Sequence, residues 1–405
     1  MIKKSLTALY QVCKLIPQNL VPKLARKHGV DKKSRTFTPW SHVVSMLYAH
    51  LGHCLSLNDV ADGLRLHSGY LSSIRKAVPP SRNGLSHANI VRNADMAEEL
   101  FWSVLGHFQQ LNPRFGYSQG YSGIPRRFKR TIHALDSTTI RLAVNCIDWA
   151  THRRKKAAVK AHVNLNVKTF LPSVVVIGKG SQHDSTKARI LCAGMKAGEI
   201  TVFDKAYVNF NHLFELEERG IFWVARAKDN MQYEIVSENK TSSDRILLDA
   251  KIRLTVPKTS MEYPKTFRLV RAIVEINGKD KEMEFITNNE EWAPSSICDL
   301  YKSRWAIEVF FKQLKQTLQL KDFLGNSENA IRWQLWMAML AYILLRFIKD
   351  NSKWTGSFAR LFTCVRAALW CRDDLYKLLK KCLRCRSKPR PEQIYLPGFL
   401  PGFSL

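Results

Sequence analysis

Residues 299–320 read DLYKSRWAIEVFFKQLKQTLQL, and the rest of the chain is organised around this stretch. No Gly or Pro interrupts it, and Pro294 with Ser295 and Ser296 marks a helix start, because Pro is tolerated in the first turn and Ser caps free N–H groups. At about 100° per residue, four polar side chains fall within one arc of roughly 60°. These four are Tyr301, Arg304, Glu308 and Lys315. We therefore predict one helix with a narrow polar stripe.

The stripe combines one carboxylate with two cations, and Lys312 lies at its edge. A carboxylate binds hard metal ions through oxygen, while the Arg fork and the Lys ammonium hold phosphate oxygens. A surface helix with Glu–Lys pairs would show similar composition. The pattern alone leaves both interpretations open.

The offsets of Tyr301, Arg304, Glu308 and Lys315 resemble the Tyr/Arg/Glu/Lys motif of DDE transposases of the insertion-sequence-four (IS-four) family. The segment ITNN (286–289) precedes the motif and DFLGNSENA (322–330) follows it, as in that family. The resemblance extends over roughly residues 131–345.

Two further carboxylates complete the resemblance. Asp136 in LDSTTI (135–140) and Asp204 in FDKAYVNF (203–210) each follow an apolar run that predicts a strand. A single strand-end Asp is more often a turn former or helix cap. Asp184 in GKGSQHDS is the alternative candidate, but it precedes a predicted helix and is interpreted as a cap.

The resemblance implies a metal-dependent DNA transposase. Asp136, Asp204 and Glu308 would be the catalytic triad and would bind two Mg²⁺ ions, for which Mn²⁺ could substitute. Two ions about 4 Å apart can serve the attacking and leaving oxygens of phosphodiester chemistry. Cleavage and strand transfer would follow a cut-and-paste route through a hairpin, with Tyr301, Arg304, Lys315 and Lys312 on DNA phosphates.

The implied partner is double-stranded DNA, as the element's terminal inverted repeats and as target DNA. Two active sites acting on two ends imply a homodimer in the synaptic complex. The composition is consistent with this partner, since the net charge is +29 over 405 residues and such an excess indicates a polyanion. A membrane is not expected, because the apolar run 335–345 is short of the ~20 residues of a bilayer span. We expect a cytoplasmic, nucleoid-associated protein.

The nine cysteines are odd in number and scattered. Cys382 and Cys385 form one CxxC, but no second pair lies at zinc-site spacing. Reduced thiols are expected, with a structural zinc ion as the alternative.

The periodicity predicts four regions. Residues 1–125 form an all-α, helix-turn-helix-like DNA-binding domain, for which a helical bundle with solvated charges is the alternative. Residues 126–228 plus 291–350 form an α/β core, RNase H-like, with a mixed sheet flanked by helices. Residues 229–290 are an inserted β-strand subdomain, and residues 351–405 are a basic C-terminal region.

Local signals refine these regions. In the first domain, Ser56 with Asp59 predicts a capping box, and Ser86 is expected to cap a long helix. In the core, a strand over 131–135 is expected to end at Asp136, followed by strands over 158–167, 171–177, 199–203 and 221–225. The basic loop THRRKK (151–156) could touch a phosphate backbone or be a solvated hairpin tip.

Two other function classes remain. A structure-specific RNase H-like nuclease would need the carboxylates but not the Tyr/Arg/Lys stripe, and would cleave without joining strands. A catalytically silent DNA-binding protein, such as a domesticated transposase, would bind DNA without any product. The intact triad and the intact polar stripe argue against a catalytically silent DNA-binding protein.

Overall fold

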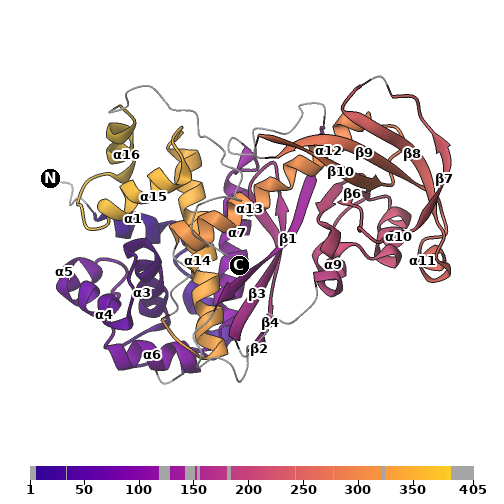
Figure 1. Ribbon diagram of the computed structural model, residues 1–405. Helices are drawn as coiled ribbons and strands as arrows, with labels where there is room; N and C mark the ends of the chain where they lie inside the picture. The colour runs from indigo at the N-terminus through magenta and orange to yellow at the C-terminus, as the bar shows by residue number, and fades with distance from the viewer. Residues whose placement is uncertain are drawn as a thin grey trace.

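The computed structural model describes residues 6–32, 34–117, 128–141, 151–152, 156–179, 184–241, 243–276, 278–318, 320 and 324–384. The centre of the loop THRRKK and Cys385 of the CxxC pair lie outside these ranges. A helical body and a large mixed sheet lie side by side (Figure 1).

The described residues between 6 and 117 form helices joined by short loops. The bounds are α1 Ala8–Lys14, α2 Leu20–Lys27, α3 Pro39–Gly52, α4 Leu57–Leu66, α5 Ser68–Leu71, α6 Arg82–Val91 and α7 Asp95–Leu111. The capping box is confirmed: Ser56 Oγ accepts from the Asp59 N–H, and the Asp59 carboxylate accepts from the Ser56 N–H. The prediction for Ser86 is wrong, because Ser81 caps α6 by accepting from the Gly84 N–H, and the chain breaks again before α7.

The C-terminal region packs against the N-terminal helices. Its helices are α14 Glu328–Asn351, α15 Phe358–Ala367 and α16 Leu375–Arg384. The backbone N–H groups of Ala8 and Leu9 donate to carbonyls of Cys371 and Leu369 at 3.1 and 2.9 Å, so α1 is tied to the loop after α15. Both ends of the described chain therefore belong to one helical body.

Helix α14 is the core of that body. By length and composition it could cross a membrane, but 94% of its most apolar window is buried in the protein. Phe347 stacks on Phe108 of α7 with ring centroids 4.0 Å apart, and Tyr342 meets Phe310 edge to face at 5.0 Å. The burial indicates a core helix.

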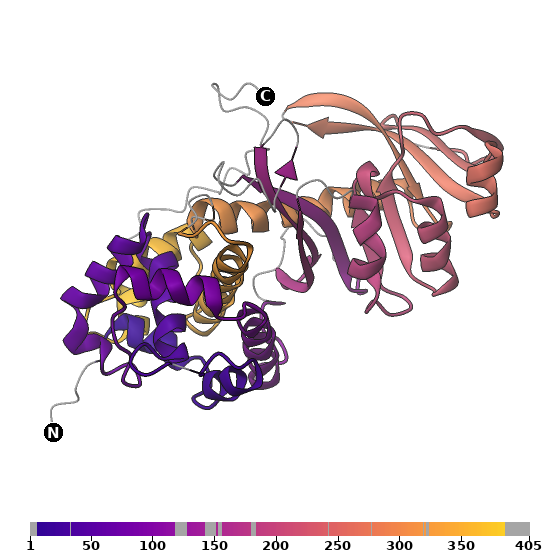
Figure 2. The same cartoon turned by 90° about the horizontal axis from the view of Figure 1, so that it is seen from below.

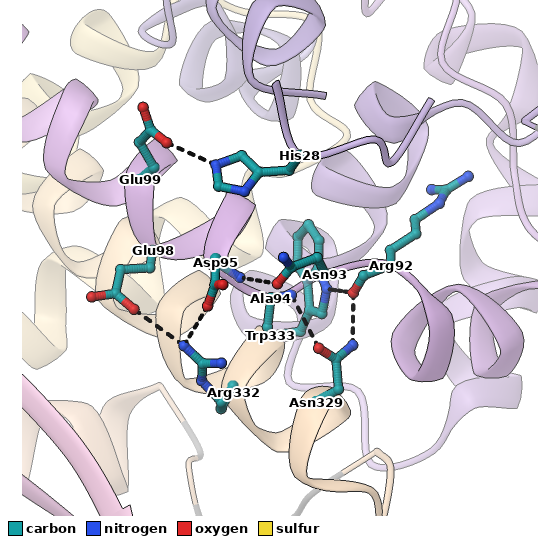
Figure 3. A network of polar contacts seen from close by, with 10 residues as sticks. All are labelled: His28, Arg92, Asn93, Ala94, Asp95, Glu98, Glu99, Asn329, Arg332 and Trp333. Atoms are coloured by element: carbon teal, nitrogen blue, oxygen red, sulfur yellow. Dashed lines mark hydrogen bonds and ion pairs between the residues drawn. The ribbon is translucent and has the colours of Figure 1, made fainter. Parts of the chain in front are cut away.

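Asn329, in the first turn of α14, joins this helix to the break between α6 and α7 (Figure 3). Its side-chain amide donates to the carbonyls of Arg92 at 2.6 Å and Asn89 at 2.8 Å, and its Oδ1 accepts from the Ala94 N–H at 3.0 Å. Trp333 Nε1 also donates to the Arg92 carbonyl, at 2.6 Å. One side chain thus satisfies backbone groups that the helix break leaves without partners.

The described strands form one ten-stranded sheet in the order β2-β3-β1-β5-β6-β10-β9-β8-β7, with β4 on the far side of β3. The bounds are β1 Ile132–Arg141, β2 Thr151–His152, β3 Lys156–Asn166, β4 Leu171–Lys179, β5 Ile200–Phe203, β6 Phe222–Arg226, β7 Tyr233–Glu238, β8 Ile246–Leu254, β9 Phe267–Ile276 and β10 Lys279–Thr287. Strands β1, β5 and β6 are parallel, and the other pairs are antiparallel.

The strands expected as an inserted subdomain continue the core sheet. Strand β10 pairs antiparallel with β6, with Ile286 opposite Ala225, and β9, β8 and β7 follow outward. The sequence separation between β6 and β10 conceals this pairing. The inserted strands are therefore held by backbone hydrogen bonds to the same sheet that carries the candidate site.

Helices cover both faces of the sheet (Figure 2). Alternate residues of one strand join different cores: Ala134 packs with the side of α12 (Pro294–Ser303), α13 (Trp305–Lys312) and α14, whereas Leu135 packs with the side of α9 (Asp184–Cys192) and α10 (Phe210–Glu218). Val202 and Phe203 of β5 divide in the same way. This period of two is expected of strands buried on both faces.

Replacing Asn329 with Asp should destabilise the fold by about 2–4 kcal/mol, because a carboxylate would face backbone carbonyls that now accept from an amide N–H. Urea unfolding at pH 7.5 measures the change. Asn58→Asp on the exposed surface of α4 is the matched control and should shift the free energy of unfolding by less than about 0.5 kcal/mol. Equal effects of the two substitutions would contradict the role of Asn329.

Candidate active site

Two of the three predicted carboxylates meet because of strand register. In the parallel pair β1–β5, Leu135 lies opposite Phe203, so Asp136 and Asp204 follow matched positions of adjacent strands. The prediction that the first strand ends at Asp136 is wrong, since β1 continues to Arg141 and Asp136 pairs with Val163 of β3. Asp136 thus lies in the part of β1 that extends beyond the end of β5, and its side chain is 21% exposed.

Glu308 comes from the predicted motif helix, but that helix is not continuous. It divides at Arg304 into α12 and α13, and the wider π-helical turn Gln313–Thr317 follows. Arg304 has helical angles, yet its N–H donates to the Tyr301 carbonyl and its own carbonyl accepts from the Ile307 N–H in tight, three-residue turns. The polar stripe therefore follows a bent path, although its members remain together.

The Arg304 guanidinium lies between two of the carboxylates. Its Nη1 donates to Asp136 Oδ2 at 2.6 Å and its Nη2 donates to Glu308 Oε1 at 2.7 Å. The side chain is only 16% exposed. Burial opposes the charged form of Arg304, but the negative charges of Asp136 and Glu308 outweigh burial and raise its pKa. The Arg304 cation therefore holds the negative charges of Asp136 and Glu308 at one partly buried position.

Tyr301 contacts the third carboxylate. Its hydroxyl donates to Asp204 Oδ1 at 3.2 Å, and its ring packs at 4.8 Å from that of Phe285 on β10. Burial, together with Asp204, raises the pKa of Tyr301 to about 12. The phenol is therefore a neutral donor at neutral pH. The described site contains Asp136, Asp204, Glu308, Tyr301 and Arg304 within one set of contacts.

Lys315 reaches the same strand from the π-helical turn. Its Nζ donates to the Thr139 carbonyl of β1 at 2.8 Å, three residues beyond Asp136. Lys312 is different: its side chain is exposed and makes no hydrogen bond or ion pair within the described residues. The structure thus brings Lys315 to the site and leaves Lys312 on the surface beside it.

The charges of the other two predicted carboxylates act on Asp136. Burial raises the pKa of Asp136 from 3.8 to about 6, Arg304 and the Ser137 N–H oppose this, and the negative charges of Glu308 and Asp204 add to it. The alternative candidate Asp184 is the first residue of α9. The acids whose charges act on Asp136 include both of the other predicted carboxylates.

Carboxylate oxygens suit a hard divalent cation, so the donor set of Asp136, Asp204 and Glu308 fits such a metal chemically. Among the described residues, no three His, Cys, Asp or Glu side chains are placed as a ready metal site. The Arg304 guanidinium occupies one oxygen of Asp136 and one oxygen of Glu308.

Sequence reasoning missed some contributors. Lys205 follows Asp204 and its Nζ lies 2.5 Å from Asp229 Oδ2, while its backbone N–H donates to Asp204 Oδ1 at 2.8 Å. Arg226 ends β6, and its charge acts on Tyr301. The sequence signal for Lys205 was its position next to the predicted carboxylate Asp204. The signal for Arg226 was its position at the end of a predicted strand.

Two tryptophans near the motifs, Trp223 and Trp292, pack against aromatic side chains but differ in how deeply they are buried. Trp223 is fully buried against Tyr263 and Phe267. Trp292 is half-buried between Phe128 and Phe222, with ring centroids 5.5 and 5.2 Å away.

Comparison with known proteins agrees with this geometry. The family model described as the transposase DDE domain matches residues 127–344, and a domain of unknown function, DUF4372, matches residues 4–74. The first match spans more than half of the chain and includes all three carboxylates. The chain belongs to the DDE transposase family.

Curated relatives place it among insertion-sequence transposases. It is 28% identical to the probable transposase for insertion sequence element IS5377 of Geobacillus stearothermophilus over 84% of each chain. It is 28% identical to putative transposase y4zB of Sinorhizobium fredii, over 73% of this chain and 79% of the relative. Transposase InsG for element IS4 of Escherichia coli is 23% identical, over 47% and 43%. The predicted IS-four family and RNase H-like core are thereby confirmed.

The raised pKa of Asp136 predicts that the ionised Asp136 side chain lowers the folding stability of this DDE transposase at neutral pH. A raised carboxyl pKa stabilises the fold at low pH, and this contribution is lost as pH rises from about 4 to 6. Without metal, Asp136→Asn should therefore be more stable than the parent by about 2–3 kcal/mol at pH 7.5, with little difference near pH 4.5.

Urea unfolding in a chelator at the two pH values measures this difference. Asp31→Asn, at an exposed position outside the site, is the control and should change neither value appreciably. A loss of stability in Asp136→Asn at pH 7.5 would show that the ion pair with Arg304 outweighs burial.

Proposed function

We propose that this DDE transposase binds the terminal inverted repeats of its insertion sequence and performs metal-dependent cleavage and strand transfer. The route is cut-and-paste, through a hairpin. The observation that carries the proposal is the meeting of Asp136, Asp204 and Glu308 at one end of adjacent strands, beside two cations and a phenol.

The chain's own groups suit a phosphodiester substrate. The Arg304 fork spans two oxygens, a geometry that matches phosphate as well as carboxylate. The Tyr301 phenol is a neutral donor, and Lys315 supplies a point charge about two turns beyond Glu308 in the motif. These contacts would position the DNA backbone, while sequence recognition lies elsewhere. When Arg304 turns to a phosphate, it releases Asp136 and Glu308.

Asp136, Asp204 and Glu308 are the residues that would hold divalent cations. Two Mg²⁺ ions, replaceable by Mn²⁺, would supply Lewis-acid stabilisation of the attacking and leaving oxygens. The positive charge of the ions would also remove the mutual repulsion of the carboxylates, which now depends on Arg304.

The proposed partners are double-stranded DNA and a second copy of the chain. The net charge of +29 favours a polyanion. Because each element has two ends, a homodimer would act in the synaptic complex, and light scattering of the protein on paired ends should give twice the mass of one chain. Such a protein would work in the cytoplasm on nucleoid DNA.

Cleavage of DNA carrying the element's own ends, with Mg²⁺, tests the proposal. Glu308→Gln should lower the single-turnover cleavage rate by about 100-fold or more, because a neutral amide cannot replace a carboxylate ligand. Chelation should abolish cleavage by the parent protein. Glu291→Gln, at an exposed neighbouring position, is the control. Full cleavage by Glu308→Gln would refute the assigned triad.

Product analysis separates the alternatives. A transposase joins the freed 3′ end to the opposite strand or to target DNA, whereas a structure-specific nuclease gives cleavage without joining. Lys315→Ala should reduce cleavage and joining while metal binding to the carboxylates, followed by calorimetry, persists. DNA binding without any product under all metal conditions would leave only a DNA-binding role.

A further inference from the structure

The π-helical turn that carries Lys315 ends against helix α3 of the N-terminal helical body. His53 Nε2 lies 2.7 Å from the Thr317 carbonyl oxygen, and His50 Nδ1 lies 3.1 Å from that of Leu318. Both histidines lie at the C-terminal end of α3, three residues apart, so they share one side of that end. The helical body therefore contacts the motif segment directly.

The partners of His53 define which nitrogen carries the hydrogen. Arg366 Nη1 lies 2.6 Å from His53 Nδ1, and a guanidinium can only donate, so Nδ1 accepts. Nε2 then carries the hydrogen and donates to the Thr317 carbonyl. Phe362 stacks on the imidazole at 4.6 Å and fixes the ring plane. Burial lowers the pKa of His53, and the charge of Arg366 adds to this, so the ring is neutral.

The contacts of His50 do not define which of its ring nitrogens carries the hydrogen. It is buried, and its two ring nitrogens face two carbonyls, those of Leu318 and of Gln334 in α14. Burial lowers its pKa to about 4, so the neutral ring has one hydrogen for two acceptors. His53 therefore makes the bond that is defined in direction.

The turn has an unusual hydrogen-bond pattern of its own. π-Helical turns are rare and often occur at functional sites. Its hydrogen bonds are wide, with the Leu318 N–H donating to the Gln313 carbonyl at 3.2 Å and the Leu320 N–H to the Leu314 carbonyl at 3.4 Å. A small apolar cavity of about 20 Å³ adjoins Phe311, Leu314 and Lys315.

We propose that His53 is a positioning residue for the transposase reaction. Its bond to the Thr317 carbonyl holds the π-helical turn so that Lys315 stays directed at β1 beside Asp136. The inference rests on the proposed function, and it makes the helical body, expected to recognise DNA, part of the support of the active site.

Substitutions at position 53 separate the hydrogen bond from packing. His53→Phe keeps a flat ring on Phe362 but removes the N–H, whereas His53→Gln retains a donor near the place of Nε2. Position 53 has φ 57°, so both variants carry a similar backbone cost. His107→Phe on α7 controls for a general His-to-Phe effect.

The experiment uses the full-length protein, a duplex carrying one element end, and Mg²⁺. His53→Phe should lower the single-turnover cleavage rate by about 10-fold or more while the Kd for the duplex changes less than about twofold, and His53→Gln should recover most of the rate. In a Lys315→Ala background, His53→Phe should cause no further loss, because the two act through one contact.

Three outcomes would overturn the inference: an unchanged rate in His53→Phe, no recovery in His53→Gln, or an equal loss in the Lys315→Ala background. Thermal unfolding of each variant identifies a temperature at which all are folded, and the background comparison is made there. Absence of cleavage by the parent protein would instead refute the proposed function, so the two failures are distinguishable.

Discussion

The arrangement of the candidate site depends on one guanidinium between two carboxylates. Asp136 and Glu308 are less than one-third exposed, and Asp204 adds a third negative charge that acts on Asp136. Like charges gathered in a poorly solvated place repel strongly, because the effective dielectric constant there is well below that of water. Arg304 reduces this repulsion with two bonds of 2.6 and 2.7 Å. The same fork suits phosphate, so a group that stabilises the resting arrangement is also suited to bind substrate.

The backbone is arranged so that this cluster can form. Parallel pairing of β1 and β5 places Asp136 and Asp204 side by side, and α12 crosses the sheet over β5, β6 and β10 before α13 presents Glu308 to β1. Because β10 pairs with β6, the inserted strands brace the strand next to β5 rather than forming a separate sheet. The bend at Arg304 and the π-helical turn then adjust the direction of the motif residues.

Much of the site could be predicted because its signals are local. The offsets from Tyr301 to Lys315 and the apolar runs before Asp136 and Asp204 are visible in the sequence, and the structure brings these residues together. The pairing of β10 with β6 could not be predicted, since strand partners distant in sequence leave no periodic signal. The π-helical turn at Gln313–Thr317 was also missed, because its residues are ordinary helix formers and give no local signal for a wider turn. Likewise, Ser81 and Ser86 are equally good caps, and only the path of the chain selects Ser81.

Charge is distributed unevenly over this architecture, and the distribution follows the layout of the fold. Residues 229–290 contain ten Lys or Arg and eleven Asp or Glu, which is a net charge of −1. The rest of the chain therefore carries +30, and the two parts add to the total of +29. Many of the insertion's charges are paired, as in the buried bonds of Arg268 with Asp249 at 2.6 and 2.8 Å. Exposed surface pairs contribute little stability, but a balanced surface also contributes little field. The net positive charge that favours a polyanion therefore lies in the rest of the chain, outside the inserted strands.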